Sequence, residues 1–193
     1  MDPSVRRHSS LEDADAMLRL HVAELLGVPA DAVRTGRLCP LCGSSGHGRP
    51  WARVDDRPDD LVVSLSRCGE HLVTAVARGG AIGVDLESVE AVDRGWDGHL
   101  VLHPAEPEDP DRRAAVWAGK EAVLKMLGTG LTVPMTAVRL ADHDMRELPA
   151  PPGHVLALAR RAVRSLSPAP GPAAAAAPSP PATPETGPRG PRR

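Results

Sequence analysis

The sequence contains no phenylalanine and no tyrosine, and its aromatic residues are three tryptophans. A core must therefore be built mainly from leucine, valine and alanine. The chain also has no apolar run of about 18 residues and no export-signal pattern, so we expect no membrane span and a cytoplasmic location. A formal net charge of −2 offers no basic field that would favour nucleic acid as a partner.

Cysteine is scarce as well, because the chain has three cysteines, an odd number that favours reduced thiols over disulfides. Cys39 and Cys42 form a Cys-x-x-Cys motif with His47 close behind, a pattern that can bind zinc. A second such motif is missing, so Cys68 or His71 would have to supply the fourth ligand. The alternative is a loop that holds two small buried thiols.

The chain is organised around residues 81–87, which have the composition and the alternation of a buried strand. Successive side chains of a strand point to opposite faces, so Asp85 and Glu87 lie on one side and Val84 and Leu86 on the other. Two neighbouring carboxylates repel each other unless a cation neutralises them, and a divalent metal with oxygen ligands would do so. The alternative is a strand end with solvated acids.

The first part of the chain predicts one helix and two strands. Apolar residues recur at helical spacing from Leu11 to Leu26, after a capping-box pattern at Ser9, and Gly27 ends the run. Residues 61–66 and 71–77 have strand composition. With residues 81–87 they predict a three-stranded antiparallel meander.

A second helix is predicted from Ala114 to Leu127, with Gly128 as its C-terminal cap. Trp117, Glu121 and Lys125 are spaced at i, i+4 and i+8, so they share one helix face.

The remaining segments carry weaker patterns. Residues 93–112 are expected to be irregular apart from a short apolar run, whereas 137–140 and 154–159 are expected to be short strands. After about Ser165 the chain is rich in proline, alanine and glycine, which predicts a disordered tail.

Several motifs together resemble the signature of the 4′-phosphopantetheinyl transferases, in the branch that modifies polyketide and non-ribosomal peptide carrier proteins. The core of the resemblance is Gly-Val-Asp-Leu-Glu at 83–87, joined to Trp-x-x-Lys-Glu-x-x-x-Lys at 117–125. Further elements are Gly-Thr-Gly-Leu at 128–131, Gly-Arg-Pro at 48–50 and Ser-Leu-Ser-Arg-Cys at 64–68.

The resemblance implies an α+β fold in which two similar halves pack as a pseudo-dimer. We assign residues 1–78 to the N-terminal half, 79–165 to the C-terminal half and 166–193 to the tail. Coenzyme A and Mg²⁺ would bind between the halves. A serine of an acyl or peptidyl carrier protein would attack the β-phosphate and release 3′,5′-ADP. The protein is expected to be a monomer with neither a nucleic-acid nor a membrane partner.

The resemblance also implies roles for single residues. Asp85, Glu87 and Glu121 would hold Mg²⁺, and Glu121 would also take the proton of the serine. Lys120 and Lys125 would stabilise charge on the pyrophosphate. The adenosine phosphates would be bound by Arg49, Ser66 and Arg67.

Three departures from the family pattern affect coenzyme A binding. Arg67 stands where relatives have histidine, and it can still bind phosphate. The N-terminal half is short, with its opening strand reduced, and Asp13 and Asp15 stand where relatives often have basic residues. Two other functions therefore stay open: a non-catalytic relative that binds carrier proteins, and a small zinc-binding module that uses Cys39, Cys42, His47 and Cys68.

Overall fold

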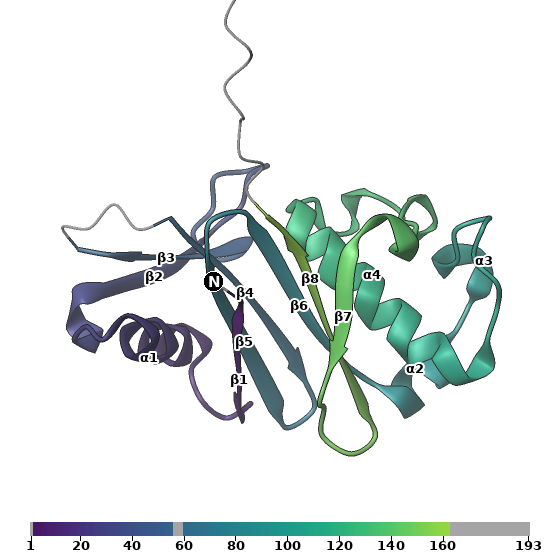
Figure 1. Ribbon diagram of the computed structural model, residues 1–193, viewed down its shortest axis with the longest axis horizontal. Helices are drawn as coiled ribbons and strands as arrows, with labels where there is room; N and C mark the ends of the chain where they lie inside the picture. The colour runs from purple at the N-terminus through teal and green to yellow at the C-terminus, as the bar shows by residue number, and fades with distance from the viewer. Residues whose placement is uncertain (1, 56–59, 163–193) are drawn as a thin grey trace, which may run out of the picture.

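The computed structural model describes residues 2–55 and 60–162, and it shows an α+β protein in which strands lie between two main helices (Figure 1). The strands are β1 (Ser4–Ser9), β2 (Val33–Leu38), β3 (Arg49–Val54), β4 (Leu61–Cys68), β5 (His71–Arg78), β6 (Ala81–Ser88), β7 (Asp144–Leu148) and β8 (His154–Arg161). The helices are α1 (Ala14–Leu26), α2 (Val89–Gly95), α3 (Gly98–Val101) and α4 (Arg113–Leu127). Short 3₁₀ helices cover 30–32, 110–112, 130–132, 135–137 and 140–142.

Two three-stranded antiparallel sheets form the centre of the molecule. One has the strand order β1–β5–β4 and the other β6–β8–β7, while β2 and β3 form a separate hairpin. The predicted meander is therefore wrong in its third strand, because β6 pairs along its length with β8 and not with β5. Alternation identifies a strand and its buried face, but it does not specify the partner strand.

The two sheets pack face to face through apolar side chains. This layer of the core contains Val73, Ala75, Ala77, Ile82, Val84, Leu86, Leu156 and Leu158. On the outer face of the first sheet, α1 and the β2–β3 hairpin enclose a second cluster, built around Leu18, Val22 and Val76. On the outer face of the second sheet lies α4, and Figure 1 shows the two helices at opposite ends of the molecule.

Gly83 allows α4 to lie directly on β6. A Cβ atom at this position would be 1.9 Å from the carbonyl oxygen of Ala122 and 2.5 Å from the amide nitrogen of Met126. Both are backbone atoms of the helix, which cannot swing aside as a side chain can. The glycine of the Gly-Val-Asp-Leu-Glu motif thus sets the distance between the strand and the helix that carry the remaining motif residues.

The N-terminal region differs from the sequence-based expectation in two ways. The opening strand is not reduced, because β1 is fully paired with β5 from Ser4 to Ser9. Ser9 and Glu12 do interact, with the Ser9 amide donating to Glu12 Oε2 at 2.9 Å. This contact lies in the turn after β1, however, and the side chain that caps α1 is Asp13.

The second helix agrees with prediction, since α4 ends at Gly128 in a left-handed conformation. The strand at 154–159 is also confirmed within β8. The strand predicted at 137–140 is wrong, because 3₁₀ turns occupy that region and β7 begins at Asp144. The segment expected to be irregular, 93–112, is partly helical, because α2 ends in it and α3 lies within it. No helix among the described residues is long and apolar enough to cross a membrane. The predicted tail lies outside the described residues.

Candidate active site

Three carboxylates and a lysine meet where β6 faces α4. Asp85 lies on β6 and is 3% exposed, while Val84 and Leu86 point to the opposite, sheet-to-sheet face, as alternation predicted. On α4, Glu121 and Lys125 are one turn apart, so both reach the same side of the helix. The ammonium of Lys125 donates to Asp85 Oδ1 at 2.5 Å.

The two oxygens of Asp85 have different surroundings. Oδ1 accepts from Lys125 and also from the hydroxyl of Ser66, at 2.8 Å. Oδ2 is buried and has no hydrogen-bond partner among the described residues. A buried carboxylate oxygen without a partner loses its hydration without compensation. The site therefore presents an unused acceptor that a hard cation could take as a ligand.

The other two carboxylates are shifted toward their neutral forms. Burial, reinforced by the Asp85 carboxylate and opposed by the Lys125 ammonium, raises the pKa of Glu87 to about 7. Burial and Asp85 likewise raise the pKa of Glu121, again against the effect of Lys125. Desolvation and like charge both disfavour an ionised carboxylate. The cluster thus combines buried carboxyl groups with the like charge of Asp85, which Lys125 offsets only in part.

Lys125 links this cluster to a cavity. Its ammonium also lies 3.2 Å from the carbonyl oxygen of Val84 and 3.5 Å from that of Leu65. The same side chain lines a cavity of about 410 Å³ between the β2–β3 hairpin, β4 and the C-terminal end of α4. A molecule in this cavity can therefore contact the lysine that holds Asp85.

The cavity presents basic side chains and small turn residues. Arg49 lies on its wall, as expected from the Gly-Arg-Pro element, and its guanidinium is next to Gly128 at the end of α4. Arg37 lies on the same wall, and sequence analysis missed it because it did not predict β2. Thr129 and Thr132 contribute hydroxyl-bearing side chains. The basic side chains can bind an anionic group, and much of the rest of the lining, which includes Pro40, Leu41 and Leu65, is apolar.

Two predicted ligands of coenzyme A, Ser66 and Arg67, lie elsewhere. Ser66 is buried, and its hydroxyl donates to Asp85 and accepts from the amide of Leu86. Arg67 points to the other face of β4, where it donates to the carbonyl oxygens of Ser10 and Glu12 at 2.8 and 3.0 Å. Ser66 therefore orients the Asp85 carboxylate, whereas Arg67 holds the turn before α1 in place.

Lys120 does not join the cluster. Its ammonium is fully buried and bonded to the carbonyl oxygens of Met135 and Val138, at 3.1 and 2.7 Å, and to the carboxylate of Glu106, at 2.6 Å. Neighbouring residues of a helix differ in direction by about 100°, so Lys120 and Glu121 cannot share a face. Sequence analysis missed Glu106, the partner that makes this burial possible.

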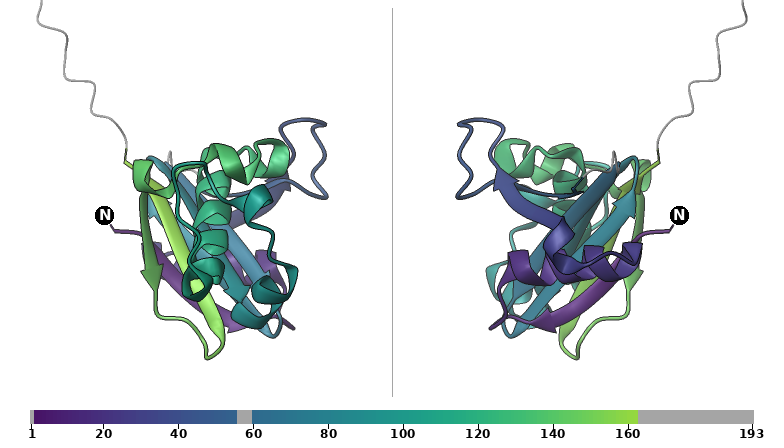
Figure 2. Two further views of the ribbon diagram at one scale, coloured as in Figure 1. Left: turned by 90° about the vertical axis from the view of Figure 1, so that its right-hand side faces the viewer. Right: turned by 90° about the vertical axis from the view of Figure 1, so that its left-hand side faces the viewer.

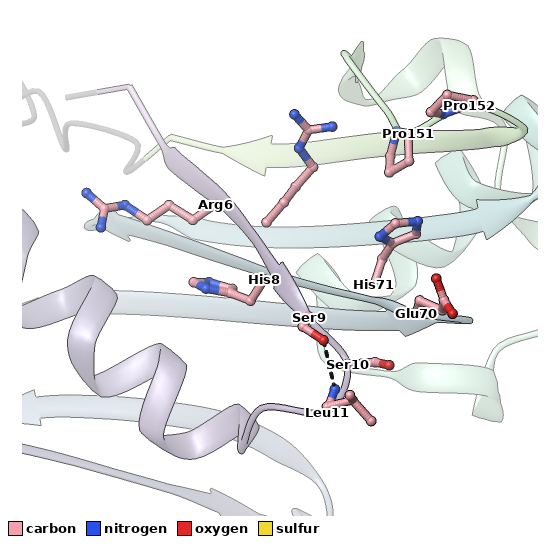
Figure 3. Close-up of a pocket in the computed structure, with 10 residues that line it drawn as sticks. Arg6, His8, Ser9, Ser10, Leu11, Glu70, His71, Pro151 and Pro152 are labelled. Carbon is pink, nitrogen blue, oxygen red and sulfur yellow. Dashed lines mark hydrogen bonds between the residues drawn. The ribbon is translucent and has the colours of Figure 1, made fainter.

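A second cavity, of about 1070 Å³, lies along β1 and the β4–β5 turn (Figure 3). Arg6, Arg7 and His8 line it together with His71 and Pro151, and none of the three clustered carboxylates does. Arg6 is already paired with Glu24. Size alone does not make this cavity the active site, since the chemically unusual groups lie around Asp85.

A comparison with known families finds a match in the second half of the described chain. Residues 81–151 match the model of the 4′-phosphopantetheinyl transferase superfamily. This segment is therefore similar to that superfamily. The matched segment runs from β6 to Pro151 and contains Asp85, Glu87, Glu121 and Lys125. A comparison with curated proteins finds no significant match. This match suggests phosphopantetheinyl transfer as the general activity.

Proposed function

We propose that this protein transfers 4′-phosphopantetheine from coenzyme A to a serine of an acyl or peptidyl carrier protein. The serine Oγ forms a new bond to the β-phosphorus, the bond from that phosphorus to the bridging oxygen breaks, and 3′,5′-ADP leaves. The observation that carries the proposal is the buried Asp85, with one unpartnered oxygen, next to two carboxyl groups of raised pKa in the matched segment.

The carboxylates fit a magnesium ion. Asp85 Oδ2 is a buried acceptor without a hydrogen-bond partner among the described residues. Burial and the Asp85 carboxylate both disfavour the ionised forms of Glu87 and Glu121, and a bound cation would relieve this. Hard oxygen donors in small numbers are typical of Mg²⁺ sites that also bind phosphate groups. Mg²⁺ bound by Asp85, Glu87 and Glu121 would neutralise charge on the pyrophosphate and so make it easier to attack.

The side chains of the cluster divide the remaining tasks. Glu121 accepts the serine proton, a role that suits a carboxylate whose pKa is raised toward neutral pH. Lys125 reaches both Asp85 and the cavity, so it can stabilise negative charge that develops on the pyrophosphate. Arg37 and Arg49 on the cavity wall bind the phosphates of the adenosine part.

The two sheets support the proposed arrangement in two similar halves. In each sheet the first strand is followed by a main helix, and the last strand lies between the other two: β1–β5–β4 repeats as β6–β8–β7. We assign the halves to residues 1–78 and 79–165, with the turn at Gly79 and Gly80 between them. On this proposal the protein acts as a monomeric pseudo-dimer in polyketide or non-ribosomal peptide biosynthesis.

The test is to incubate the full chain with coenzyme A, Mg²⁺ and a panel of apo carrier proteins, and to measure the intact mass of each carrier. We expect a gain of one phosphopantetheine group that requires added Mg²⁺. Glu121→Gln keeps the size of the side chain and removes the base, so it is the matched negative control. Mg²⁺ is withdrawn by omission rather than by a chelator, so that other metals stay in place.

Binding of a carrier protein without any mass gain, across the whole panel and at saturating coenzyme A, would contradict the proposal. That outcome would favour the non-catalytic carrier-protein-binding relative.

A further inference from the structure

The loop between β2 and β3 gathers three side chains that the proposed reaction does not use. The donor atoms of Cys39, Cys42 and His47 all lie within 4.8 Å of one another. Cys42 Sγ is 3.4 Å from His47 Nε2. Cys39 is buried at the base of the loop, whereas Cys42 and His47 are exposed. Figure 2 shows this loop projecting from the body of the molecule.

Backbone hydrogen bonds hold the loop in this shape. The amide of Cys39 donates to the carbonyl oxygen of Ser44, and the amide of Gly43 donates to that of Cys39, both at 2.9 Å. Gly43 has a φ of 72°, which turns the chain back just after Cys42. The backbone amides of Cys42 and Leu41 lie within hydrogen-bonding reach of the sulfur of Cys39. Converging amides of this kind are typical of sites that hold an anionic sulfur.

Gly48 brings His47 to the cysteines. Its φ is 103°, and a Cβ atom here would lie 2.5 Å from three backbone atoms: the Cα and the amide nitrogen of Cys39 and the carbonyl oxygen of Leu38. A glycine is therefore required for the two ends of the loop to approach so closely. The ladder between β2 and β3, which pairs Leu38 with Arg49, fixes the base of the loop from below. The three donors are thus placed by a rigid hairpin and not by a chance approach of surface side chains.

We propose that this loop binds one zinc ion through the thiolates of Cys39 and Cys42 and the imidazole of His47. Two soft sulfur ligands and one imidazole nitrogen select Zn²⁺ over the hard Mg²⁺ that suits the carboxylate cluster. The two thiols lose their protons to solvent when the metal binds. Because Cys42 and His47 are exposed, water takes the fourth position.

The fourth ligand expected from the sequence lies elsewhere. Cys68 is at the end of β4, where it is opposite His71, and burial together with the nearby Glu87 carboxylate raises the pKa of its thiol. His71 makes an edge-to-face contact with His154 at 5.0 Å. Both residues therefore belong to the β4–β5 turn, and Cys68 becomes a natural control because it is a cysteine outside the loop.

The zinc site would brace one wall of the cavity that we propose for coenzyme A. Cys39 and Gly48 line that cavity together with Arg37 and Arg49. An ion that ties the loop to itself would hold both arginines in place. The binding of zinc does not depend on the proposed function, whereas this consequence does.

The test measures metal content in the full chain without reference to activity. The protein is purified under reducing conditions, supplied with zinc, desalted and analysed by inductively coupled plasma mass spectrometry. We expect about one zinc ion per chain for wild type and for Cys68→Ser, and less than about a tenth of that for Cys42→Ser and His47→Ala. Cys42 and His47 are exposed, and far-ultraviolet circular dichroism verifies that each variant is folded.

Replacing zinc by cobalt supplies a second measurement. Wild type should show sulfur-to-cobalt charge-transfer bands and the strong visible bands of a tetrahedral ion, and Cys42→Ser should lose part of the former. Equal zinc in wild type and Cys42→Ser, no retained zinc in wild type, or a Cys39–Cys42 disulfide that persists under reducing conditions would each overturn the proposal. None of these outcomes bears on phosphopantetheinyl transfer, which the mass assay on carrier proteins decides separately.

Discussion

The two helix-covered sheets both bury polar groups beneath their helix, and they treat them in opposite ways. Under α1, the imidazole of His21 is 1% exposed, with one nitrogen 2.8 Å from the hydroxyl of Thr74 and the other 2.9 Å from that of Ser4. Burial, with a smaller effect of Arg6, lowers the pKa of His21 to about 4, so the ring is neutral. Under α4, the corresponding space holds Asp85, Glu121 and Lys125.

The difference lies in how completely the buried groups are paired. Both nitrogens of His21 have partners, and the group carries no charge near neutral pH, so the network is a stable part of the core. Asp85 keeps an unpartnered oxygen, and two neighbouring carboxyl groups are forced toward protonation. A polar cluster that is incompletely satisfied lowers stability and is typical of a binding or catalytic site. This contrast indicates a structural role for the buried polar groups of the first sheet. It supports the proposed catalytic role for those of the second sheet.

The largest effect is expected from neutralising the second cluster. Asp85→Asn and Glu121→Gln should each lower turnover by roughly a hundred- to a thousand-fold, because each removes charge needed in the transition state. Without added metal, Glu121→Gln should not lower the free energy of unfolding, because it relieves repulsion, whereas Asp85→Asn also removes the charge paired with Lys125 and should lower it. Rapid carrier modification followed by mass spectrometry gives turnover, and urea unfolding gives stability.

Combination variants sharpen the same test. If Asp85, Glu87 and Glu121 act on one metal, the triple alanine variant should be little worse than the most damaging single variant. Losses that multiply would mean that the three carboxylates act independently.

The approach of α4 to β6 should be nearly as sensitive. Gly83→Ala places a methyl group against the helix backbone and should cost about 3 kcal/mol of unfolding free energy, or displace Glu121 and Lys125 from Asp85. Gly119→Ala is the matched control, because its Cβ atom would meet only the side-chain ends of Met145 and Leu140. The urea midpoint of that variant should stay close to that of wild type. Equal losses of stability in both variants would mean that any added methyl group under α4 is destabilising. The backbone contact at Gly83 would then not be the specific cause.

The two buried networks should respond to pH with opposite signs. The pKa of His21 is lowered from 6.5 to about 4, so its contribution to stability is present above pH 6.5 and is lost as the pH falls toward 4. The pKa of Glu87 is raised from 4.5 to about 7, so its contribution is present below pH 4.5 and is lost as the pH rises through 7. In the wild type without added metal, the two slopes should largely cancel between pH 5 and pH 7.

Single substitutions should reveal the pH dependence of stability that each of the two groups causes. Glu87→Gln should lose about 2 kcal/mol of unfolding free energy when the pH is lowered from 7 to 5, and His21→Gln should gain a similar amount. Denaturant unfolding at several pH values measures both. Parallel curves for the two variants would show that these groups do not control the pH dependence.

The smallest effect is expected at Arg67. Its two hydrogen bonds to the carbonyl oxygens of Ser10 and Glu12 are exposed, so Arg67→Ala should cost about 1 kcal/mol of stability or less. The Michaelis constant for coenzyme A should stay within about two-fold of wild type. A ten-fold rise that is absent with 3′-dephospho-coenzyme A would instead restore the phosphate-binding role that sequence similarity suggested.

The sequence identified most of what alternation and helical spacing can specify. Strand period placed Asp85 on the face opposite Val84, and helix period placed Glu121 beside Lys125. The same periods place Lys120 on another helix face and Arg67 on the strand face opposite Ser66, which the sequence analysis did not use. The motif resemblance, however, had assigned both residues to coenzyme A.

What the sequence could not supply is mainly tertiary. Strand β1 is short and polar, and it becomes a strand because β5 offers it an edge. The pairing of β6 with β8 joins residues from 66 (Ser88 and His154) to 80 (Ala81 and Arg161) positions apart, which local pattern does not encode. The unpartnered oxygen of Asp85 and the clash that Gly83 avoids depend on distances across elements. In the Cys39 loop, the sequence contained the ligand types, and the hairpin supplied their proximity.

The two sheets meet at a seam where β4 faces β6 through side chains. The amides of Val84 and Leu86 donate to the hydroxyls of Ser64 and Ser66, at 3.0 and 3.2 Å. In an ordinary sheet the acceptors are backbone carbonyl oxygens, which every residue has. Here the acceptors are side-chain hydroxyls, which occur only at every second residue of β4. A slip of one residue would bring Leu65 to these amides and leave them without an acceptor. The two-residue spacing of Ser64 and Ser66 therefore fixes the register between β4 and β6. This register in turn sets the position of Asp85 in its cluster.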